Sequence, residues 1–450
     1  MTRSAGTPGD SSEGRAGSTG PGAGASATGD GLIRRRRARR LRIAALGATV
    51  LVLGGLGAGL AAYVKLSGNI TADEAAAEEL RRYEKERPTA LVKGAQNILL
   101  IGSDTRSGSG NGQYGHYNGT ERSDTVILLH LAADRRSATA VSLPRDLMVN
   151  VPSCRKPDGS RTEPMFAMFN YAYEMGGSAC LIRTVEKLTD IRVDHHVVVD
   201  FSGFKEMVDA VDGVEVCLKR PVTDKDAKLR LPAGRVTLNG EQALGYVRVR
   251  KSLGNGSDTD RMERQQRFLG ALVNKVRSDD VLLNPVKLYP VLDAATSSLT
   301  TDPALASLRG LYQLVRGLRE IPTDRVRFLT VPRESYVYNA NRDQLVEPEA
   351  EKLFARLRAD QAVEVAGEVP RDSGANGSNP DANSASPGPN ASHSVPDSMT
   401  ERDSSAHPSG YAGYVLGAAF DDGAPRVSPA HAPSPTPTFH GNTAAEDLCG

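Results

Sequence analysis

Residues 243–268 read ALGYVRVRKSLGNGSDTDRMERQQRF, and this stretch is the starting point for predicting what the chain does. In its first half, Arg248 and Arg250 alternate with two valines. Strict alternation is typical of a β-strand, in which successive side chains point to opposite faces. The pattern therefore predicts a short strand that carries both guanidinium groups on one face, followed by a glycine-rich turn.

The second half of the same stretch predicts a helix. Asp258, Arg261 and Gln265 recur at helical spacing, and Arg264 lies beside them. Arginines gathered in this way repel one another, but they suit a compact polyanion such as a diphosphate, which guanidinium groups bind through paired hydrogen bonds. The alternative is a solvated run of charge. The stretch is thus either an anion site or an exposed charged surface.

The composition predicts one large domain with extensions. The chain has 450 residues, 39% of them hydrophobic, and a formal net charge of +1 at pH 7. This length supports a sizeable core. The near-neutral charge gives no reason to expect nucleic-acid binding, so any basic surface must be local. The absence of tryptophan disfavours broad stacking platforms for sugars or bases, although the 13 tyrosines leave such a platform open.

A membrane-spanning helix is predicted near the N-terminus. Residues 1–42 are polar and end in a block with seven arginines, which predicts a disordered cytoplasmic leader. Residues 43–64 carry no charge and are long enough to cross a bilayer as one helix. Because the arginines precede this helix, everything after Lys65 is predicted to be extracellular, in a single-pass membrane protein. A cleaved signal peptide is the alternative, but the apolar stretch is long for one.

The remaining chain divides into three parts. Residues 65–93 are rich in Ala, Glu and Arg, which predicts a juxtamembrane helix and linker. Between residues 94 and 362, apolar runs suited to strands buried on both faces alternate with helical patterns, which predicts a mixed sheet covered by helices. Residues 363–450 are rich in Ser, Pro and Asn and are predicted to form a flexible tail.

The chain has four cysteines, and all of them follow the predicted membrane helix. An even number in an oxidising compartment predicts disulfides, and their spacing fits no zinc site. Cys154 and Cys180 bracket one short segment and are predicted to form a pair. That leaves Cys217 and Cys449, whose bond would fasten the end of the tail to the domain.

Two aspartates lie where apolar strands end or begin. Asp104 follows one such run, and Asp124 opens the next. Ligands of open α/β sheets bind at strand ends, and carboxylate oxygens beside a phosphate suit a magnesium ion. Each aspartate alone is more often a cap or turn residue. Together with Arg122, Arg145 and the arginines of residues 243–268, they predict a metal-assisted diphosphate site.

Five linked motifs resemble the LytR-CpsA-Psr family. They are NILLIGSDTR at 97–106, RSDT at 122–125, SLPRD at 142–146, FNYAY at 169–173, and YVRVR at 246–250 with DxxRxxRQ at 258–265. Their order and spacing, the single membrane helix and the arginine-rich leader are similar to actinobacterial members. The resemblance covers about residues 94–360. Any one motif alone would be weak, whereas the linked set is specific.

The resemblance implies an α/β/α sandwich with a central mixed sheet and an apolar pocket for lipid. It implies an extracellular, Mg²⁺-dependent phosphotransferase that moves a glycopolymer from a polyprenyl diphosphate carrier onto peptidoglycan and releases polyprenyl phosphate. The implied metal ligands are Asp104 and Asp124. The residues expected to contact the diphosphate are Arg122, Arg145, Arg248, Arg250, Arg261, Arg264 and Gln265. Arg145 is also expected to act in catalysis, and Asp258 is the candidate general base.

Two alternative functions stay open. In a diphosphatase, which is also conceivable as a side activity, water replaces the sugar hydroxyl as the nucleophile. In a non-enzymatic wall sensor or scaffold, the domain binds polyprenyl lipids and needs neither aspartate. One segment departs from the family's pattern: the glycine-rich insertion from Gly108 to Gly119 separates the two aspartates. We interpret it as a mobile lid or as a determinant of acceptor choice.

Overall fold

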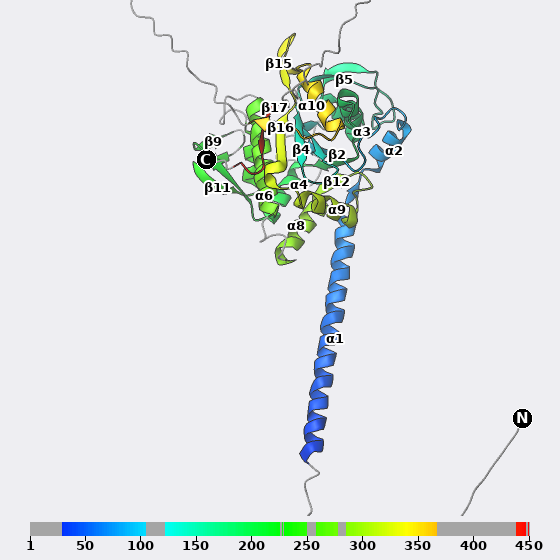
Figure 1. The fold of residues 1–450 in the computed structure, drawn as a ribbon, viewed down its shortest axis with the longest axis vertical. Helices are drawn as coiled ribbons and strands as arrows, with labels where there is room; N and C mark the ends of the chain where they lie inside the picture. The colour runs from blue at the N-terminus through cyan, green and yellow to red at the C-terminus, as the bar shows by residue number, and fades with distance from the viewer. Residues whose placement is uncertain are drawn as a thin grey trace, which may run out of the picture.

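A nine-stranded mixed sheet forms the centre of the protein in a computed structural model, which describes residues 29–104, 122–225, 227, 229–249, 258–277, 285–366, 438–446 and 449. The strands lie in the order β1-β12-β7-β2-β3-β4-β13-β17-β16 (Figure 1). Their bounds are β1 Thr71–Ala72, β12 Leu299–Thr301, β7 His195–Val199, β2 Gln96–Ser103, β3 Ser123–Leu131, β4 Ala138–Leu143, β13 Val326–Thr330, β17 Thr438–Thr443 and β16 Glu364–Ala366.

Helices cover both faces of this sheet, so the predicted α/β/α arrangement is confirmed. One face packs against α2 (Glu74–Arg82), α3 (Asn170–Thr189) and α10 (Glu349–Arg358), and the other against α6 (Asp258–Arg277) and α9 (Leu308–Arg319). A second core joins α6 to α4 (Phe201–Ala210), α5 (Gly240–Arg248) and two small antiparallel pairs, β8 (Val214–Leu218) with β11 (Gly234–Leu238) and β9 (Val222–Asp224) with β10 (Leu229–Leu231). The remaining short elements are β5 (Met148–Val151), β6 (Met165–Met168), β14 (Arg333–Tyr336), β15 (Asn339–Leu345) and the 3-10 helix η2 (Thr323–Arg325).

The central strands are buried on both faces because their side chains alternate between two apolar clusters. In β2, Leu99 and Ile101 pack with α3 and α10, whereas Ile98 belongs to the cluster on the opposite face. In β3, Leu128 and Ile127 divide in the same way. Strands buried on both faces have nearly continuous apolar sequences, which is why the sequence predicted them.

The first half of residues 243–268 folds differently from its prediction. Residues 240–248 form helix α5, so Arg248 ends a helix and does not lie on a strand. The physical reason is a capping box at the start of α5: the Asn239 side chain accepts a hydrogen bond from the Gln242 N–H at 2.9 Å, and the Gln242 side chain accepts one from the Asn239 N–H at 3.1 Å. These bonds satisfy amides of the first turn and favour a helix over the extended form.

The N-terminal helix α1 (Gly29–Asn69) projects from one end of the protein (Figure 1). Its segment Arg39–Asn69 is long and apolar enough to cross a membrane. The most apolar stretch of this segment has a mean hydropathy of 2.0, and none of it is buried inside the protein. This agrees with the predicted anchor. The helix already includes residues 29–42, which the sequence predicted to be disordered. At its other end, α1 contacts α8 (Pro285–Ser298) through an ion pair of 2.8 Å between Lys65 Nζ and Asp293 Oδ2.

The prediction of a flexible tail over residues 363–450 is wrong at both ends of that range. Its first residues form β16, and its last residues form β17, which pairs antiparallel with β13 and parallel with β16. Two features hold the end of the chain in the sheet: Phe439 is buried, and a disulfide joins Cys217 to Cys449 across a sequence separation of 232 residues. The amino-acid composition did not predict this strand, because a short strand anchored by one ring and one covalent bond hardly changes the average composition of a polar segment. Residues 367–437 lie outside the described part.

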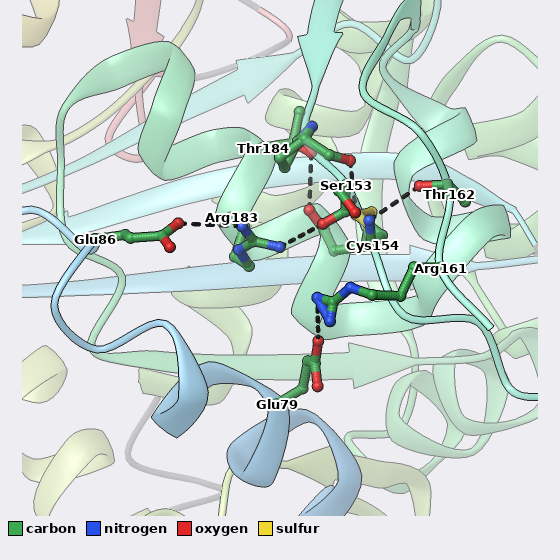
Figure 2. The surroundings of a disulfide bond; sticks show 10 residues. Glu79, Glu86, Ser153, Cys154, Arg161, Thr162, Arg183 and Thr184 are labelled. Atoms are coloured by element: carbon green, nitrogen blue, oxygen red, sulfur yellow. Dashed lines mark hydrogen bonds and ion pairs between the residues drawn. A yellow bond between two sulfur atoms is a disulfide. The ribbon is translucent and has the colours of Figure 1, made fainter. Parts of the chain in front are cut away.

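Both predicted disulfides are confirmed in the structure. Cys154 and Cys180 have Cα atoms 5.5 Å apart and join α3 to the loop that follows β5. Figure 2 shows the surroundings of this bond, where the Thr162 side chain accepts a hydrogen bond of 2.9 Å from the Cys154 N–H. On the chain-entropy account, closing a loop of this length stabilises the fold by about 3–4 kcal/mol.

Charged side chains around that disulfide fasten the juxtamembrane segment to the domain. Arg183 on α3 donates a hydrogen bond of 2.6 Å to the Ser153 carbonyl and pairs with Glu86 at 3.4 Å (Figure 2). Arg161 pairs with Glu79 on α2 at 3.3 Å (Figure 2). The helix predicted after the membrane span is therefore present as α2 and is held against the domain by these contacts.

Candidate functional site

A cavity of about 530 Å³ lies between the sheet and the second core. Side chains from β2, β3, β7, α4, α5 and α6 line it, and most of them are apolar. Phe204 of α4 and Phe268 of α6 belong to this lining, with ring centroids 5.5 Å apart. The predicted apolar pocket between sheet and helices is therefore present.

Polar side chains gather in one part of this lining. Asp124, Arg248, Arg261 and Gln265 all contribute to the cavity. A smaller recess shares Asp124, Arg261 and Gln265 with the cavity and adds Arg145. The fold thus brings together one predicted metal ligand and four predicted diphosphate ligands from β3, α5, α6 and the loop after β4. We call Arg145, Arg248 and Arg261 the cavity cluster.

A β-bulge places Asp124 at this position. Gly102 of β2 pairs with Thr125 of β3, whereas the next residue, Ser103, pairs with Ser123. Asp124 is therefore the extra residue of β3. A bulge bends the strand locally and redirects the side chain of the extra residue, and such bulges are frequent beside active sites.

Asp104 lies at the same edge of the sheet, immediately after β2. Its N–H donates to the Arg122 carbonyl at 2.9 Å, and its Oδ1 accepts from the Arg122 N–H at 2.6 Å. Among the described residues, no group of three or more His, Cys, Asp or Glu side chains is arranged to hold a metal. Mg²⁺ commonly takes only one or two carboxylates and completes its shell with phosphate oxygens and water. Asp104 and Asp124 supply two carboxylates at this edge, which are the ligand type and number that such an ion takes from a protein.

Arg145 is held in place by two carboxylates. Its Nη1 lies 2.8 Å from Asp124 Oδ1, and its Nε lies 3.3 Å from Asp146 Oδ2. The side chain is largely buried in the loop between β4 and β5. These ion pairs give the guanidinium a fixed orientation at the recess beside Asp124.

Arg248 and Arg261 reach the cavity from two helices. Arg248 is the last residue of α5, and its guanidinium carbon lies 4.6 Å from the centroid of the Phe201 ring. Arg261 stands in the first turn of α6 and is only 6% exposed. In the next turn, Gln265 donates a hydrogen bond of 3.3 Å to the Val247 carbonyl, which joins the two helices.

One residue that positions this site was missed by the sequence analysis. Gln266 is buried, and its side-chain amide donates to Ser142 and Thr330, each at 3.0 Å. These bonds fix the first turns of α6 to the ends of β4 and β13. The only sequence signal is a polar residue on the apolar side of the predicted helix, next to Gln265.

Two predicted diphosphate ligands line neither the cavity nor the smaller recess. Arg122 pairs with Glu174 at 2.7 Å, and this hydrogen bond raises the pKa of Arg122. Arg264 is buried and donates to the Val249 carbonyl, and burial lowers the pKa of Arg264. In this structure, Arg122 therefore supports the segment around Asp104, and Arg264 supports the end of α5.

Three other predictions lie outside the described part of the chain. Arg250 follows the last described residue of that segment. Asp258 begins α6, but its side chain is not among those described. The insertion Gly108–Gly119 also lies outside the described residues. The roles assigned to these residues stay predictions.

Comparison with known proteins points to one family. A sequence profile of the LytR_cpsA_psr family matches residues 63–359. The chain is 36% identical over 264 residues to the cell wall biosynthesis protein LcpA of Corynebacterium glutamicum, a match covering 53% of this chain and 50% of LcpA. It is also 36% identical over 229 residues to the probable cell wall biosynthesis protein LcpB of the same organism, covering 49% of this chain and 52% of LcpB. The match thus spans about half the length of these two curated relatives.

Further similarities extend to other bacteria. The chain is 28% identical over 335 residues to the polyisoprenyl-teichoic acid–peptidoglycan teichoic acid transferase TagT of Bacillus subtilis, covering 71% of this chain and 96% of TagT. Among solved structures, the LytR-Csp2A-Psr enzyme from Actinomyces oris matches with a TM-score of 0.47 and 22% identity, covering 60% of this chain and 93% of that one.

Proposed function

The chain belongs to the LytR-CpsA-Psr family, and we propose that it is a membrane-anchored phosphotransferase that moves a glycopolymer from a polyprenyl diphosphate carrier onto peptidoglycan. One observation carries this proposal: an apolar cavity whose polar part gathers Asp124, Arg248, Arg261 and Gln265. An amphipathic ligand with an apolar chain and a diphosphate head matches both parts of this lining. The similarity to TagT, a polyisoprenyl-teichoic acid–peptidoglycan teichoic acid transferase, supports the same reaction class.

In the proposed complex, the cavity cluster binds the diphosphate. Guanidinium groups suit this task because they stay charged and donate paired hydrogen bonds to phosphate oxygens. Arg145, Arg248 and Arg261 come from three different elements, so they approach the head group from different directions. The apolar lining, which includes Phe204 and Phe268, receives the first part of the polyprenyl chain.

The proposed reaction is an in-line displacement at phosphorus. A hydroxyl group of peptidoglycan attacks the phosphorus next to the glycan, a new P–O bond forms, and the bond to the bridging oxygen breaks. Polyprenyl phosphate leaves with that oxygen, and the proton of the attacking hydroxyl passes to a base, for which Asp258 is our candidate. Guanidinium groups that are already in place stabilise the charge on the phosphoryl oxygens in the transition state.

We further propose that Asp104 and Asp124 hold a magnesium ion together with diphosphate oxygens. When bound, such an ion supplies positive charge that neutralises the leaving phosphate. The protein contributes two carboxylates from adjacent strands, one of them at the bulge between β2 and β3. The ion pair between Arg145 and Asp124 fixes that carboxylate before the ligand arrives.

The proposed location is the outer face of the cell membrane, with the N-terminus in the cytoplasm. The seven arginines before residue 43 favour this orientation under the positive-inside rule. The two disulfides also favour it, because they need an oxidising compartment. A reporter enzyme that is active only outside the cytoplasm, fused after residue 90, should be active, and a silent fusion would reverse the topology.

The proposed function is tested with the purified full chain in detergent and a polyprenyl diphosphate-linked glycan labelled in its sugar. With peptidoglycan present, we expect label on the wall polymer and an equal amount of released polyprenyl phosphate. Release without peptidoglycan would instead identify a diphosphatase, and binding without release would identify a sensor or scaffold. The Asp124→Asn variant is the matched control and should bind the lipid without transferring the glycan.

A further inference from the structure

Helix α9 is amphipathic, yet none of its residues is buried. Two of its leucines pack against the core, while Leu308, Tyr312 and Val315 follow one another at i, i+4 and i+7 and form an outward apolar stripe. Tyr312 is 64% exposed and Val315 is 46% exposed. A soluble surface helix normally turns such a stripe toward the core, so this one requires a partner.

Arginines flank the stripe on its polar side. Arg309 and Arg316 are exposed and continue around the helix from Tyr312, whereas Arg319, four residues after Val315, is exposed at the end of the stripe itself. Glu320, just beyond the helix, lies 3.7 Å from Arg316. An apolar stripe with arginines beside it is typical of helices that lie in the interface of a membrane, where the arginines meet anionic head groups.

The position of α9 fits such a partner. In Figure 1, α8 and α9 lie at the end of the protein from which α1 leaves. α8 runs alongside α1, because Asn69 contacts Asp293 and Thr296 whereas Lys65 contacts Asp293. Lys65 directly follows the uncharged stretch of α1 and therefore marks the level of the membrane surface.

Exposed apolar side chains of α8 lie at that same level. The Lys65 ammonium group lies 5.7 Å from the centroid of the Tyr289 ring. Tyr289 and Leu292 are 37% and 38% exposed. Tyrosine at the level of the head groups is typical of the aromatic belts that anchor membrane proteins.

We propose that α8 and α9 form a membrane-docking face, made of Tyr289, Leu292, Leu308, Tyr312 and Val315, that seats in the head-group region of an anionic bilayer. This goes beyond anchoring by α1, because a single helix would leave the domain free to tilt. Since α8 packs on α4, docking also holds a cavity-lining helix close to the bilayer. This proposal requires only that α1 spans the membrane, and it does not depend on the transferase reaction.

The test uses the absence of tryptophan from the chain. Tyr312→Trp places a single tryptophan on the docking face, and Tyr338→Trp places one at the 85% exposed tip of the β14–β15 hairpin, at the far end of the protein (Figure 1). Each full-length variant is reconstituted into phosphatidylcholine–phosphatidylglycerol vesicles with and without brominated acyl chains. We expect strong quenching for Tyr312→Trp and none for Tyr338→Trp.

A second probe keeps the test independent of one substitution. Val315→Trp lies on the same stripe and should be quenched like Tyr312→Trp. Adding Arg309→Glu and Arg316→Glu should reduce the quenching in anionic vesicles by weakening attraction to the head groups. Quenching of both stripe variants that is no greater than that of Tyr338→Trp would overturn the proposal.

A different observation at the opposite end carries a second inference. The hairpin of β14 and β15 reaches the end of the protein farthest from α1 (Figure 1). At its tip, the Tyr336 and Tyr338 rings lie 5.4 Å apart, and the Phe166 ring of β6 lies 6.0 Å from Tyr336. Phe166 is 52% exposed, so three neighbouring rings form an accessible aromatic row. No sequence pattern predicted that these rings would meet, because Phe166 lies far from the hairpin in the chain.

The base of the same hairpin is connected to the cavity cluster. The Asp343 N–H donates to the Asp146 carbonyl at 3.1 Å, and Arg342 lies 3.6 Å from the Asp146 carboxylate. Asp146 is the residue that pairs with Arg145. Arg333, at the start of β14, donates to Thr259 in the first turn of α6. The hairpin therefore connects the aromatic row at its tip to the site at its base.

We infer that this aromatic row binds the sugar rings of the acceptor glycan, an inference that rests on the proposed function. Exposed rings suit stacking on the apolar faces of sugars, and the two tyrosines add a hydroxyl that can form hydrogen bonds. The row also points away from the membrane, into the space that a wall polymer occupies outside the cell. Asn339 and Asn341 at the tip are exposed and can donate hydrogen bonds to ring substituents.

The test measures binding separately from transfer. The full chain in detergent is titrated with soluble glycan strands released from peptidoglycan, and acceptor KM is measured in the transfer assay. Tyr338→Ala and Phe166→Ala should each raise the Kd for glycan about twofold to tenfold. Tyr312→Ala, on the docking face, is the control and should leave the Kd unchanged.

The aromatic-row inference and the proposed function would fail in different ways. If wild type binds glycan through Tyr338 but transfers nothing to it, the proposed function fails and the aromatic row stands. If wild type transfers glycan while Tyr338→Ala and Phe166→Ala keep its Kd and acceptor KM, the aromatic row is wrong and the proposed function stands.

Discussion

Two clusters of arginines in the described part of the protein differ in what adjoins them. In the cavity cluster, Arg248 and Arg261 line an open space of about 530 Å³. Around the Cys154–Cys180 disulfide, a second group, which we call the clamp cluster, consists of Arg87, Arg161 and Arg183. These arginines face protein carboxylates and one aromatic ring instead of a cavity.

The contacts of the clamp cluster show what a structural arginine looks like. Arg87 pairs with Glu186 at 2.7 Å, and both side chains are almost fully buried. The guanidinium carbon of Arg183 lies 3.3 Å from the centroid of the Tyr83 ring, and that of Arg161 lies 5.3 Å from the same centroid. The number of clustered arginines alone therefore does not reveal a binding site. What distinguishes the cavity cluster is an adjoining space that a ligand can fill.

The largest loss of stability is expected when the clamp cluster is disrupted. Arg87→Ala leaves the Glu186 carboxylate, which is 3% exposed, without the guanidinium that binds it. Removing one partner of a buried ion pair typically costs about 3–5 kcal/mol of stability. Urea unfolding of the detergent-solubilised chain should show this loss, while transfer per folded molecule stays at the wild-type level. A loss below about 1 kcal/mol would mean that the pair is solvated.

The next effect concerns the disulfide that the clamp cluster surrounds. Replacing Cys154 and Cys180 by alanine opens a loop with a sequence separation of 26 residues. On the chain-entropy account, stability should fall by about 3–4 kcal/mol. Non-reducing peptide mapping of membrane-isolated protein checks the bond itself. Finding Cys154 or Cys180 as a free thiol there would remove this prediction.

A smaller effect in free energy, but a decisive one for function, is expected in the cavity cluster. A hydrogen bond to a charged group contributes about 1.5–3 kcal/mol, so Arg248→Ala should lower the transfer rate by a factor of about 10 to 150. Arg248→Lys keeps the charge but loses the planar fork, so it should also be substantially impaired. Neither variant should lose more than about 1 kcal/mol of stability, because Arg248 ends its helix. Normal transfer by Arg248→Ala would remove this residue from the site.

The smallest effect comes from a buried histidine outside both clusters. Burial lowers the pKa of His130 below its usual 6.5, although a hydrogen bond with Asp360 opposes this shift. The unfolded chain therefore takes up a proton near pH 6.5 while the folded state does not, so stability falls as the pH drops below 6.5. Urea unfolding at pH 7.5 and 5.5 should show a smaller loss for His130→Asn than for wild type. An equal loss in both would rule out His130 as a cause.

The sequence predicted the parts of the fold that depend on local pattern. The apolar runs of β2 and β3 identified the central strands, since their side chains are buried on both faces. It predicted α5 wrongly, because the capping box at Asn239 lies upstream of the Arg–Val alternation and prevails over it. It missed β17 because one buried ring, Phe439, and one disulfide hold that strand in the sheet.

The candidate site was predicted by residue type but not by arrangement. Sequence motifs named Asp124, Arg248 and Arg261, yet the bulge that places Asp124 depends on strand register, which a single sequence does not show. Likewise, Arg264 carries the same charge as Arg261 only one helical turn away and is equally buried, yet its side chain bonds to the end of α5 while that of Arg261 lines the cavity. The side chains packed around each of these two arginines determine which role it has.

We propose that the cavity cluster, and not the clamp cluster, binds the diphosphate of a lipid carrier. Calorimetric titration of the full chain in detergent with a short-chain polyprenyl diphosphate measures this directly in wild type, Arg261→Ala and Arg183→Ala. We predict a Kd at least about tenfold higher for Arg261→Ala and an unchanged Kd for Arg183→Ala. An unchanged Kd for folded Arg261→Ala, or an equal rise in both variants, would contradict the claim.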